Sequence, residues 1–281
     1  MRNKILAKHD SERDHVMSQP AVAALAPLPF ELVYSDGEPL ETEWHVWELY
    51  LLLESFQQAM AEQGRTDFYV GGNMFVYYSQ EQAREVWEEE TGQLSKEPAF
   101  RGPDVFWVGG VSPHQRKAWV SWDEDWRLPD VIVELLSPKT AENDRTKKKE
   151  LYQNVFHTAE YFLYDPDAEA LEGFRLMSSS YQPIPPNREG RLWSEQLGVS
   201  FGFWQGVFNN KTYLWLRLFR PDGNMVLTEA ETERQRADAA RQQADAARQQ
   251  ADAERQRANE AEAELTRLRA LLAETSSPES S

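Results

Sequence analysis

The 281-residue sequence predicts an α/β domain, a mixed sheet flanked by helices, followed by a long C-terminal α-helix. Short β-branched apolar runs alternate with segments of helical periodicity through the first 220 residues. Beyond that, a unit of seven residues, Arg-Ala-Asp-Ala-Ala-Arg-Gln, repeats along the chain. A hydrophobic content of 41% and an aromatic content of 12% suffice for one domain with its own core.

Composition gives the boundaries of these parts. We expect a flexible N-terminal tail over 1–27, a folded domain over 28–227, a coiled-coil helix over 228–274 and a disordered end over 275–281. The absence of cysteine excludes disulfides, thiolate chemistry and a cysteine-held zinc. No apolar window approaches the ~18 residues that span a membrane, and the first residues lack the apolar core of a secretory signal. We therefore expect a cytoplasmic protein without a membrane partner.

The first elements of the domain are a helix and a strand pair. The helix is predicted from Thr42 to about Gln63, because its apolar residues recur at helical spacing. These residues are Val46, Leu49, Tyr50, Leu53, Phe56 and Met60. Residues 67–78 then indicate two strands, or one bent strand, around Gly71-Gly72.

Two acid-bearing strands come next. Glu134 lies inside the β-branched run 131–136, which is typical of a strand covered on both faces. A carboxylate there is costly unless a cation or a lysine pairs with it. Asp104 follows Pro103 and opens a second short apolar run, which could lie beside the first and bring both carboxylates to one point.

The segment 144–156 predicts a helix that carries three consecutive lysines. Its expected buried face consists of Leu151, Tyr152, Val155 and Phe156. Of the lysines, only Lys148 is three residues before Leu151 and four before Tyr152, so its side chain should lean inward. Lys147 and Lys149 should be mostly solvated. Asn143 or Asp144 would cap the helix just beyond the carboxyl end of the preceding strand, where ligands commonly bind.

More β structure follows the lysine-bearing helix. Residues 161–164 predict a strand that ends at Asp165-Pro166, and further strands are expected at about 171–176, 192–204 and 213–219. The ten tryptophans indicate core and edge packing more than a platform for stacking bases.

Each candidate site residue also has a structural interpretation. Pro-Asp is a common turn former, so Asp104 alone favours a structural role. A lysine triplet is typical of a solvated face. A buried glutamate is rare enough that Glu134 favours a functional role. The three residues together follow the ligand order of a metal-dependent nuclease: Asp104 first, then the buried Glu134, then Lys148 on the helix.

Three stretches carry a resemblance to a known family: Pro129–Thr140, the positions Asp144, Lys148 and Leu151-Tyr152, and Ala159–Pro166. They resemble the Uma-two family of predicted restriction endonucleases, in the PD-(D/E)xK nuclease superfamily, over about residues 28–220. The resemblance implies a restriction-endonuclease-like fold, with Asp104 and Glu134 as its two acids. Leu136 stands where the superfamily pattern has lysine. Members of the family share this departure, and the resemblance implies that the lysine has moved to Lys148.

These residues suit metal-dependent hydrolysis of phosphodiester bonds in nucleic acid, with DNA as the expected substrate. Mg²⁺, with Mn²⁺ as an alternative, is typically held by one or two carboxylates and by substrate phosphate oxygens. Asp104 and Glu134 are the predicted ligands, and Lys148 could orient a water or stabilise charge on the phosphate. Asp130 shares a strand face with Glu134 but lies about 13 Å away at ~3.3 Å per residue, so it is interpreted as a strand-entry residue.

The net charge of −17 is the main observation against a nucleic-acid substrate, because duplex affinity depends on lysine and arginine. A local basic rim could form from Arg101, Lys139, Arg145, Lys147 and Lys149. The alternative hypothesis is a non-cleaving nuclease-fold module that binds or assembles through its C-terminal helix.

That helix contains a seam at alternate three- and four-residue steps. The seam positions are Ala237, Ala240, Ala244, Ala247, Ala251, Ala258, Ala261, Leu265, Leu268 and Leu272. Because alanine buries little surface, the seam is weak before its leucine end, and Glu254 interrupts it. We expect a homo-oligomer through 228–274. The alternative is a solitary charged helix held by local ion pairs.

Overall fold

The computed structural model describes residues 27–35, 42–92 and 99–275. Contacts divide the chain into Met1–Glu31 and Leu32–Ser281, and every helix and strand that the structure describes belongs to the second unit. The expected flexible tail and disordered end lie outside the described residues, except for residues 27 and 275.

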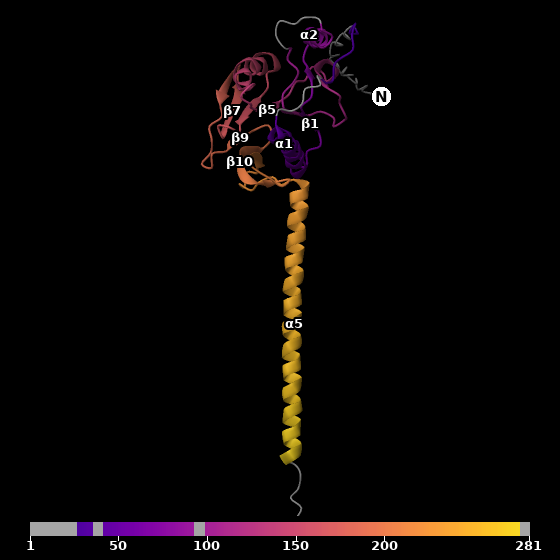
Figure 1. Cartoon of the computed structure of the whole chain (residues 1–281), viewed down its shortest axis with the longest axis vertical. Coiled ribbons are helices and arrows are strands. Elements are labelled where there is room, and N and C mark those ends of the chain that lie inside the picture. The colour runs from indigo at the N-terminus through magenta and orange to yellow at the C-terminus, as the bar shows by residue number, and fades with distance from the viewer. Residues whose placement is uncertain (1–26, 36–41, 93–98, 276–281) are drawn as a thin grey trace, which may run out of the picture. The chain divides into compact units, whose positions relative to one another are not determined.

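A six-stranded mixed sheet forms the centre of the domain, as predicted (Figure 1). Its strands, in spatial order, are β1 (Phe68–Gly72), β3 (Val105–Gly109), β5 (Val131–Leu135), β6 (Glu160–Asp165), β7 (Ala170–Met177) and β8 (Ser180–Pro183). The central pair β5 and β6 is parallel, whereas the other pairs are antiparallel. The carboxyl ends of β5 and β6 therefore meet at one edge of the sheet.

Two smaller sheets complete the β structure. One consists of the antiparallel strands β9 (Leu192–Ser194), β10 (Val199–Phe208) and β11 (Lys211–Phe219). The other is the parallel pair β2 (Val76–Tyr77) and β4 (Trp119–Val120). The strands predicted around Gly71-Gly72 and in the second half of the domain are thus confirmed.

Helix α1 (Glu43–Glu62) begins where predicted, because Oγ1 of Thr42 accepts a hydrogen bond from the backbone N–H of His45. Its buried face includes Leu52 and Phe56. The expectation that Tyr50 is buried was wrong: its side chain is 58% exposed, since the buried face is rotated towards Leu52. Helix α2 (Gln80–Glu90) and the short 3₁₀ turn η1 (Ser121–Asp123) follow.

Residues 141–156 form one continuous helix, here called the lysine helix. It consists of α3 (Ala141–Asn143), the π turn η2 (Asp144–Lys148), α4 (Lys149–Leu151) and the π turn η3 (Tyr152–Phe156). The helix begins at Ala141, so the predicted cap at Asn143 or Asp144 was wrong. Val155, expected to be buried, is 47% exposed. The error at Val155 follows from the π turn η3, whose i→i+5 bonds break the 3.6-residue period. The error at the cap arises because the helix begins earlier, where the Ala141 N–H donates to the Ser137 carbonyl at 2.9 Å.

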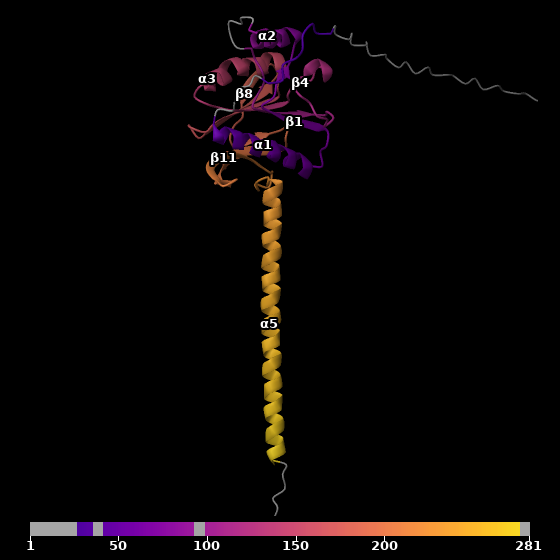
Figure 2. The same cartoon turned by 45° about the vertical axis from the view of Figure 1, so that its right-hand side comes forward.

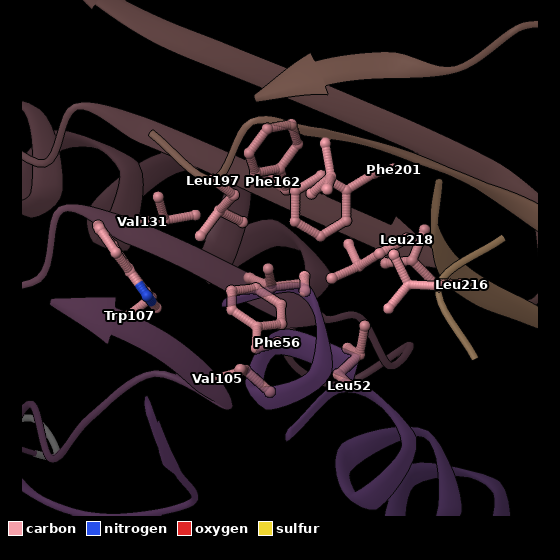
Figure 3. Packing of buried hydrophobic residues seen from close by; sticks show 14 of the residues in the cluster. Leu52, Phe56, Val105, Trp107, Val131, Phe162, Leu197, Phe201, Leu216 and Leu218 are labelled. Carbon is pink, nitrogen blue, oxygen red and sulfur yellow. The ribbon is translucent and has the colours of Figure 1, made fainter. Parts of the chain in front are cut away.

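The central sheet separates two hydrophobic clusters, because alternate side chains of a strand point to opposite faces. On one face Val131, Val133 and Leu135 pack with α1 and the three-stranded sheet. Figure 3 shows Phe56 of α1 near Phe201 of β10 within this cluster. On the other face Ile132 packs with Tyr152 and Phe156 of the lysine helix. Figure 2 shows α1 and α3 on opposite sides of the sheet.

The predicted C-terminal helix is confirmed as α5 (Glu229–Thr275), one residue from the expected boundary at each end (Figure 1). Thr228 and Glu231 form a capping box: Thr228 N–H donates to the Glu231 carboxylate at 2.8 Å, and Glu231 N–H donates to Thr228 Oγ1 at 3.2 Å. The same carboxylate accepts two hydrogen bonds, 2.7 and 2.9 Å long, from the fully buried guanidinium of Arg217 in β11. Among the residues described, no helix has a stretch both long and apolar enough to cross a membrane.

Candidate active site

Asp104 and Glu134 lie opposite each other at one end of strands β3 and β5. The antiparallel register pairs Val105 with Val133, so the next position along sets Asp104 against Glu134. The backbone N–H of Asp104 donates to Glu134 Oε2 at 3.3 Å, and the backbone N–H of Leu135 donates to Asp104 Oδ2 at 2.7 Å. The structure thus brings the two predicted carboxylates together.

Lys148 of the lysine helix lies against this carboxylate pair. Its Nζ is 3.0 Å from Glu134 Oε2 and 2.9 Å from Asp144 Oδ1. The inward lean expected for this lysine is therefore what the structure contains, whereas Lys147 is exposed. Lys149 lies over the ring of Phe174, with Nζ 3.3 Å from the ring centre. The three predicted site residues form one cluster, and their catalytic roles stay predictions.

Three further side chains contact the cluster. The hydroxyl of Tyr152 donates to Glu134 Oε1 at 2.7 Å, which fixes the buried carboxylate from the helix side. Asp144, also buried, supplies a third carboxylate around Lys148. From the other face of the sheet, His45 near the start of α1 brings its Nε2 to 3.5 Å from Asp104 Oδ1.

The electrostatics of the cluster follow from burial and close charge. Burial, together with the nearby carboxylates Asp104 and Asp144, raises the pKa of Glu134 to about 8 despite Lys148. Burial acts to lower the pKa of Lys148, but the surrounding carboxylates raise it overall. Burial acts to raise the pKa of Asp104, but His45, Lys148 and the Leu135 N–H hold it below its usual range.

Three carboxylates around one lysine leave an excess of negative charge, and an additional cation would offset it. Within the described ranges, no group of three or more His, Cys, Asp or Glu side chains is spaced to hold a metal. Among these residues, a centre with three or more protein ligands, whether histidine or carboxylate, is therefore a poor fit. Two carboxylates with free acceptor capacity, here Asp104 and Glu134, fit Mg²⁺, which keeps waters and takes its remaining ligands from a substrate.

A cavity of about 540 Å³ opens beside Lys148. We call it the cationic cleft, because Arg101, Lys139, Lys147 and Lys148 line it and no acidic residue does. It extends from the lysine helix to the Arg101–Gly102 segment that precedes Asp104. This is a local basic surface on a chain of strongly negative net charge.

The predicted basic rim is only partly formed in this cleft. Arg145 pairs with Glu172 at 2.8 Å and Asp165 at 3.1 Å, and neither Arg145 nor Lys149 lines the cleft. Asp130 also lies away from the site, with Oδ2 accepting from the Gly109 N–H at 2.8 Å, in keeping with its interpretation as a strand-entry residue.

Sequence reasoning missed the contributions of His45, Asp144 and Tyr152 to the cluster. Asp144 was assigned to a cap and Tyr152 to apolar packing. For Asp144 a signal existed, since it stands four residues before Lys148, the spacing of a helical ion pair. For His45 no local signal existed, because its approach to Asp104 depends on how α1 packs against the sheet.

Residues 27–210 match the Uma2 family, described as "Putative restriction endonuclease", a match that spans more than half of the sequence. The chain belongs to the Uma2 family. Family membership indicates a nuclease, and the resemblance expected over residues 28–220 is confirmed over residues 27–210.

A solved structure is also similar, described as a "putative nuclease belonging to DUF820" from Anabaena variabilis ATCC 29413. It is 12% identical, the match covers 58% of this chain and 81% of that one, and the TM-score is 0.38. No curated protein matches the sequence.

Proposed function

We propose that this protein is a Mg²⁺-dependent endonuclease that hydrolyses phosphodiester bonds in nucleic acid, with DNA as the expected substrate and Mn²⁺ as an alternative ion. The observation that carries the proposal is the cluster of Asp104, Glu134 and Lys148 beside the cationic cleft. A phosphate backbone in that cleft would meet four cationic side chains close to the carboxylate pair, of which Arg101 also pairs with Glu90 and Lys148 with Glu134. Such a protein would act in the cytoplasm.

Asp104 and Glu134 would hold the ion, which when bound polarises a phosphoryl oxygen and lowers the pKa of a coordinated water. The backbone N–H of Leu135 orients Asp104, and the hydroxyl of Tyr152 orients Glu134. Both carboxylates are therefore fixed before any substrate arrives, which limits the reorganisation needed during the reaction.

Lys148 has two partners in this arrangement, and this matters for its proposed role. When a cation takes over Glu134, Lys148 can stay charged and held by Asp144. Its ammonium group is then available to orient a water or to stabilise charge that develops on the phosphate. A lysine paired with Glu134 alone would lose its only ionic partner when the cation binds.

The decisive test is cleavage of supercoiled plasmid, single-stranded DNA and RNA, each with Mg²⁺, with Mn²⁺ and with chelator. We expect cleavage that requires the ion and is abolished by Glu134→Gln. Cleavage that persists in chelator, or in the Glu134→Gln variant, would contradict the proposal.

A second candidate function is a non-cleaving binding or assembly module. Its supporting observation is the Lys148–Glu134 ion pair, in which the lysine itself already neutralises a proposed ligand. In that case nucleic acid would bind in the cationic cleft without ion-dependent cleavage, and assembly would occur through α5.

We further propose that 28–227 acts as the nuclease domain and 228–274 as a homo-oligomerising coiled coil. The C-terminal leucines of α5 support this proposal: Leu265, Leu268 and Leu271 are each at least half exposed, and Leu272 is 68% exposed. Burying such a row of leucines against a second copy would stabilise the helix at the end where its seam is strongest.

A further inference from the structure

A second cavity, of about 650 Å³, lies at the carboxyl ends of β5 and β6. Its walls come from the start of α1, from the residues after β5 and β6, and from the β10–β11 hairpin. Trp44 and Tyr213 contribute partly exposed aromatic side chains, Tyr164 is fully buried against Trp44, and Gln205 contributes an amide. We call it the aromatic pocket. Its volume is within the range of about 300–1,000 Å³ that is common for small-molecule sites.

The aromatic pocket and the cationic cleft differ sharply in charge. No lysine or arginine lines the aromatic pocket, whereas Glu43, Asp167 and Glu169 do. Glu43 is paired with Lys211 at 2.7 Å, which leaves the exposed Asp167 and Glu169 at the wall. A phosphate group is repelled there. A neutral aromatic ring with N–H donors suits the pocket, because rings stack on rings and carboxylates accept from exocyclic amino groups.

The pocket also borders the candidate active site directly. His45 lines it, and the Nε2 of this buried imidazole is 3.5 Å from Asp104 Oδ1. Leu136 and Ser137, which line it as well, come immediately after the end of β5 that carries Glu134. The carboxylate pair therefore lies between a cationic cleft, beside Lys148, and an aromatic pocket, beside His45.

We infer that the aromatic pocket binds one unpaired nucleobase next to the scissile phosphate, so that the substrate is single-stranded or locally unpaired nucleic acid. The inference rests on the proposed nuclease function. The sugar-phosphate backbone lies in the cationic cleft, and the neighbouring base turns away from it into the aromatic pocket. A base inside an intact duplex is stacked and paired and cannot enter such a pocket unless it is extruded.

The test uses oligonucleotides that carry a single abasic site, moved one position at a time along the strand, in DNA and RNA versions. With the full-length protein and Mg²⁺, we expect one position beside the cleaved bond at which the abasic site lowers kcat/KM on the order of tenfold, since one stacked base typically contributes that much. A duplex with a short unpaired bubble should be cleaved faster than the same duplex fully paired. The DNA and RNA arms identify the sugar of the substrate.

Two variants connect this effect to the pocket. Trp44→Leu and Gln205→Ala should lower cleavage of the intact strand and leave cleavage of the critical abasic strand unchanged. Trp193→Leu is the matched control, because Trp193 is 37% exposed on β9 and lines neither cavity. It should leave both substrates unaffected. Equal losses on the intact and abasic strands, or equal cleavage of all abasic strands by the unchanged protein, would overturn the inference.

A binding measurement separates this inference from the proposed function. If no nucleic acid is cleaved, the nuclease proposal fails. Binding of a strand that contains the fluorescent base 2-aminopurine then tests whether a base enters the aromatic pocket. Fluorescence quenching that depends on Trp44 would support a base in the pocket without catalysis. If the strand binds but its fluorescence quenching is the same with the unchanged protein and with Trp44→Leu, the inference is overturned.

Discussion

Nζ of Lys148 lies 3.0 Å from Oε2 of Glu134, across the junction between the lysine helix and strand β5. Of the three consecutive lysines, only Lys148 leans into the helix–sheet interface. The contact joins it to Glu134, the buried carboxylate of the sheet. It makes the role of that lysine separable by experiment from the role of its two neighbours.

We predict that Lys148→Ala lowers the cleavage rate by roughly a hundredfold or more, the usual cost of losing one preorganised electrostatic group. Lys147→Ala and Lys149→Ala are the matched controls: the first should mainly change the salt dependence of binding, and the second, outside the cationic cleft, should have little effect. Steady-state rates at several salt concentrations, with thermal melts of every variant, provide the measurement. Equal losses in all three variants would indicate a diffuse basic patch instead of a catalytic lysine.

We predict that Glu134→Gln abolishes Mg²⁺-dependent cleavage and leaves the fold intact. The amide oxygen can keep the bond from the Asp104 N–H, and the amide NH2 can donate to the Tyr152 hydroxyl, which then accepts, so packing is preserved while a ligand charge is lost. Circular dichroism and the unfolding midpoint check the fold, and a metal titration checks the site. An unfolded variant would show that Glu134 has a mainly structural role.

A third prediction concerns Glu48, which is fully buried in α1 and accepts one hydrogen bond, from the Leu216 N–H at 3.2 Å. Burial raises the pKa of Glu48 well above its ordinary value, against the effects of the Leu216 N–H and Arg217. Between the ordinary glutamate pKa of about 4.3 and this higher value, the folded protein keeps a proton that the unfolded chain has released. The free energy of unfolding therefore falls as pH rises through that window.

Glu48→Gln removes this pH dependence. Near pH 4, the free energy of unfolding of the variant should match that of the unchanged protein. At pH 7 it should be higher by about 1 kcal/mol or more, because the unchanged protein loses up to ~1.4 kcal/mol for each pH unit within the window. Urea unfolding at both pH values measures the difference. Glu62→Gln is the control. Glu62 is more exposed than Glu48 and pairs with Arg220, so its replacement should change the free energy of unfolding by less than about 1 kcal/mol at either pH. A constant difference at all pH values would argue against a buried, protonated Glu48.

The fourth prediction concerns the junction between the domain and α5. Glu231→Gln should reduce the free energy of unfolding by on the order of 3 kcal/mol, because it leaves the fully buried guanidinium of Arg217 without its ionic partner. Glu233→Gln, in the same helix turn but with an exposed partner, Arg236, is the control and should have little effect. Similar stability of the two variants would show that the buried pair is dispensable.

The last prediction concerns self-association. Leu265→Asp combined with Leu268→Asp should weaken oligomer formation, because it sets charge at the apolar seam of α5. Ala240→Asp with Ala244→Asp, at the alanine end of the same seam, should weaken it less, since alanine buries less surface. Sedimentation equilibrium at micromolar concentration gives the masses. A monomeric full-length protein would mean that the helix serves another purpose.

The fold and the core of the candidate site were predictable because both depend on local patterns. The β-branched run around Glu134 and the short run after Asp104 define adjacent strands, and period-two alternation sends both carboxylates to the face that the lysine helix covers. Helical spacing then selects Lys148. Apart from the pairing of the two strands, which joins Asp104 to a residue 30 positions later, each of these steps needs only neighbouring residues.

The remaining parts of the site depend on information that is not local. The π turn η3 moves Val155 outward, and no 3.6-residue pattern anticipates this. His45 reaches Asp104 only because α1 crosses the opposite face of the sheet, so its sequence neighbours gave no indication of this contact. The buried face of α1 was misjudged at Tyr50 for a related reason, since packing against the three-stranded sheet sets the rotation of the helix.

The contact between Arg217 and Glu231 has a consequence for the order of folding during synthesis. The guanidinium of Arg217 belongs to the last strand of the domain, but its ionic partner is made fourteen residues later, in the first turn of α5. Until Glu231 has left the ribosome, burying Arg217 would leave its charge without this ionic partner, which disfavours closure of the final strand. The last step of domain folding is therefore coupled to the start of the helix, and we expect a chain cut at residue 227 to be less stable than the intact protein.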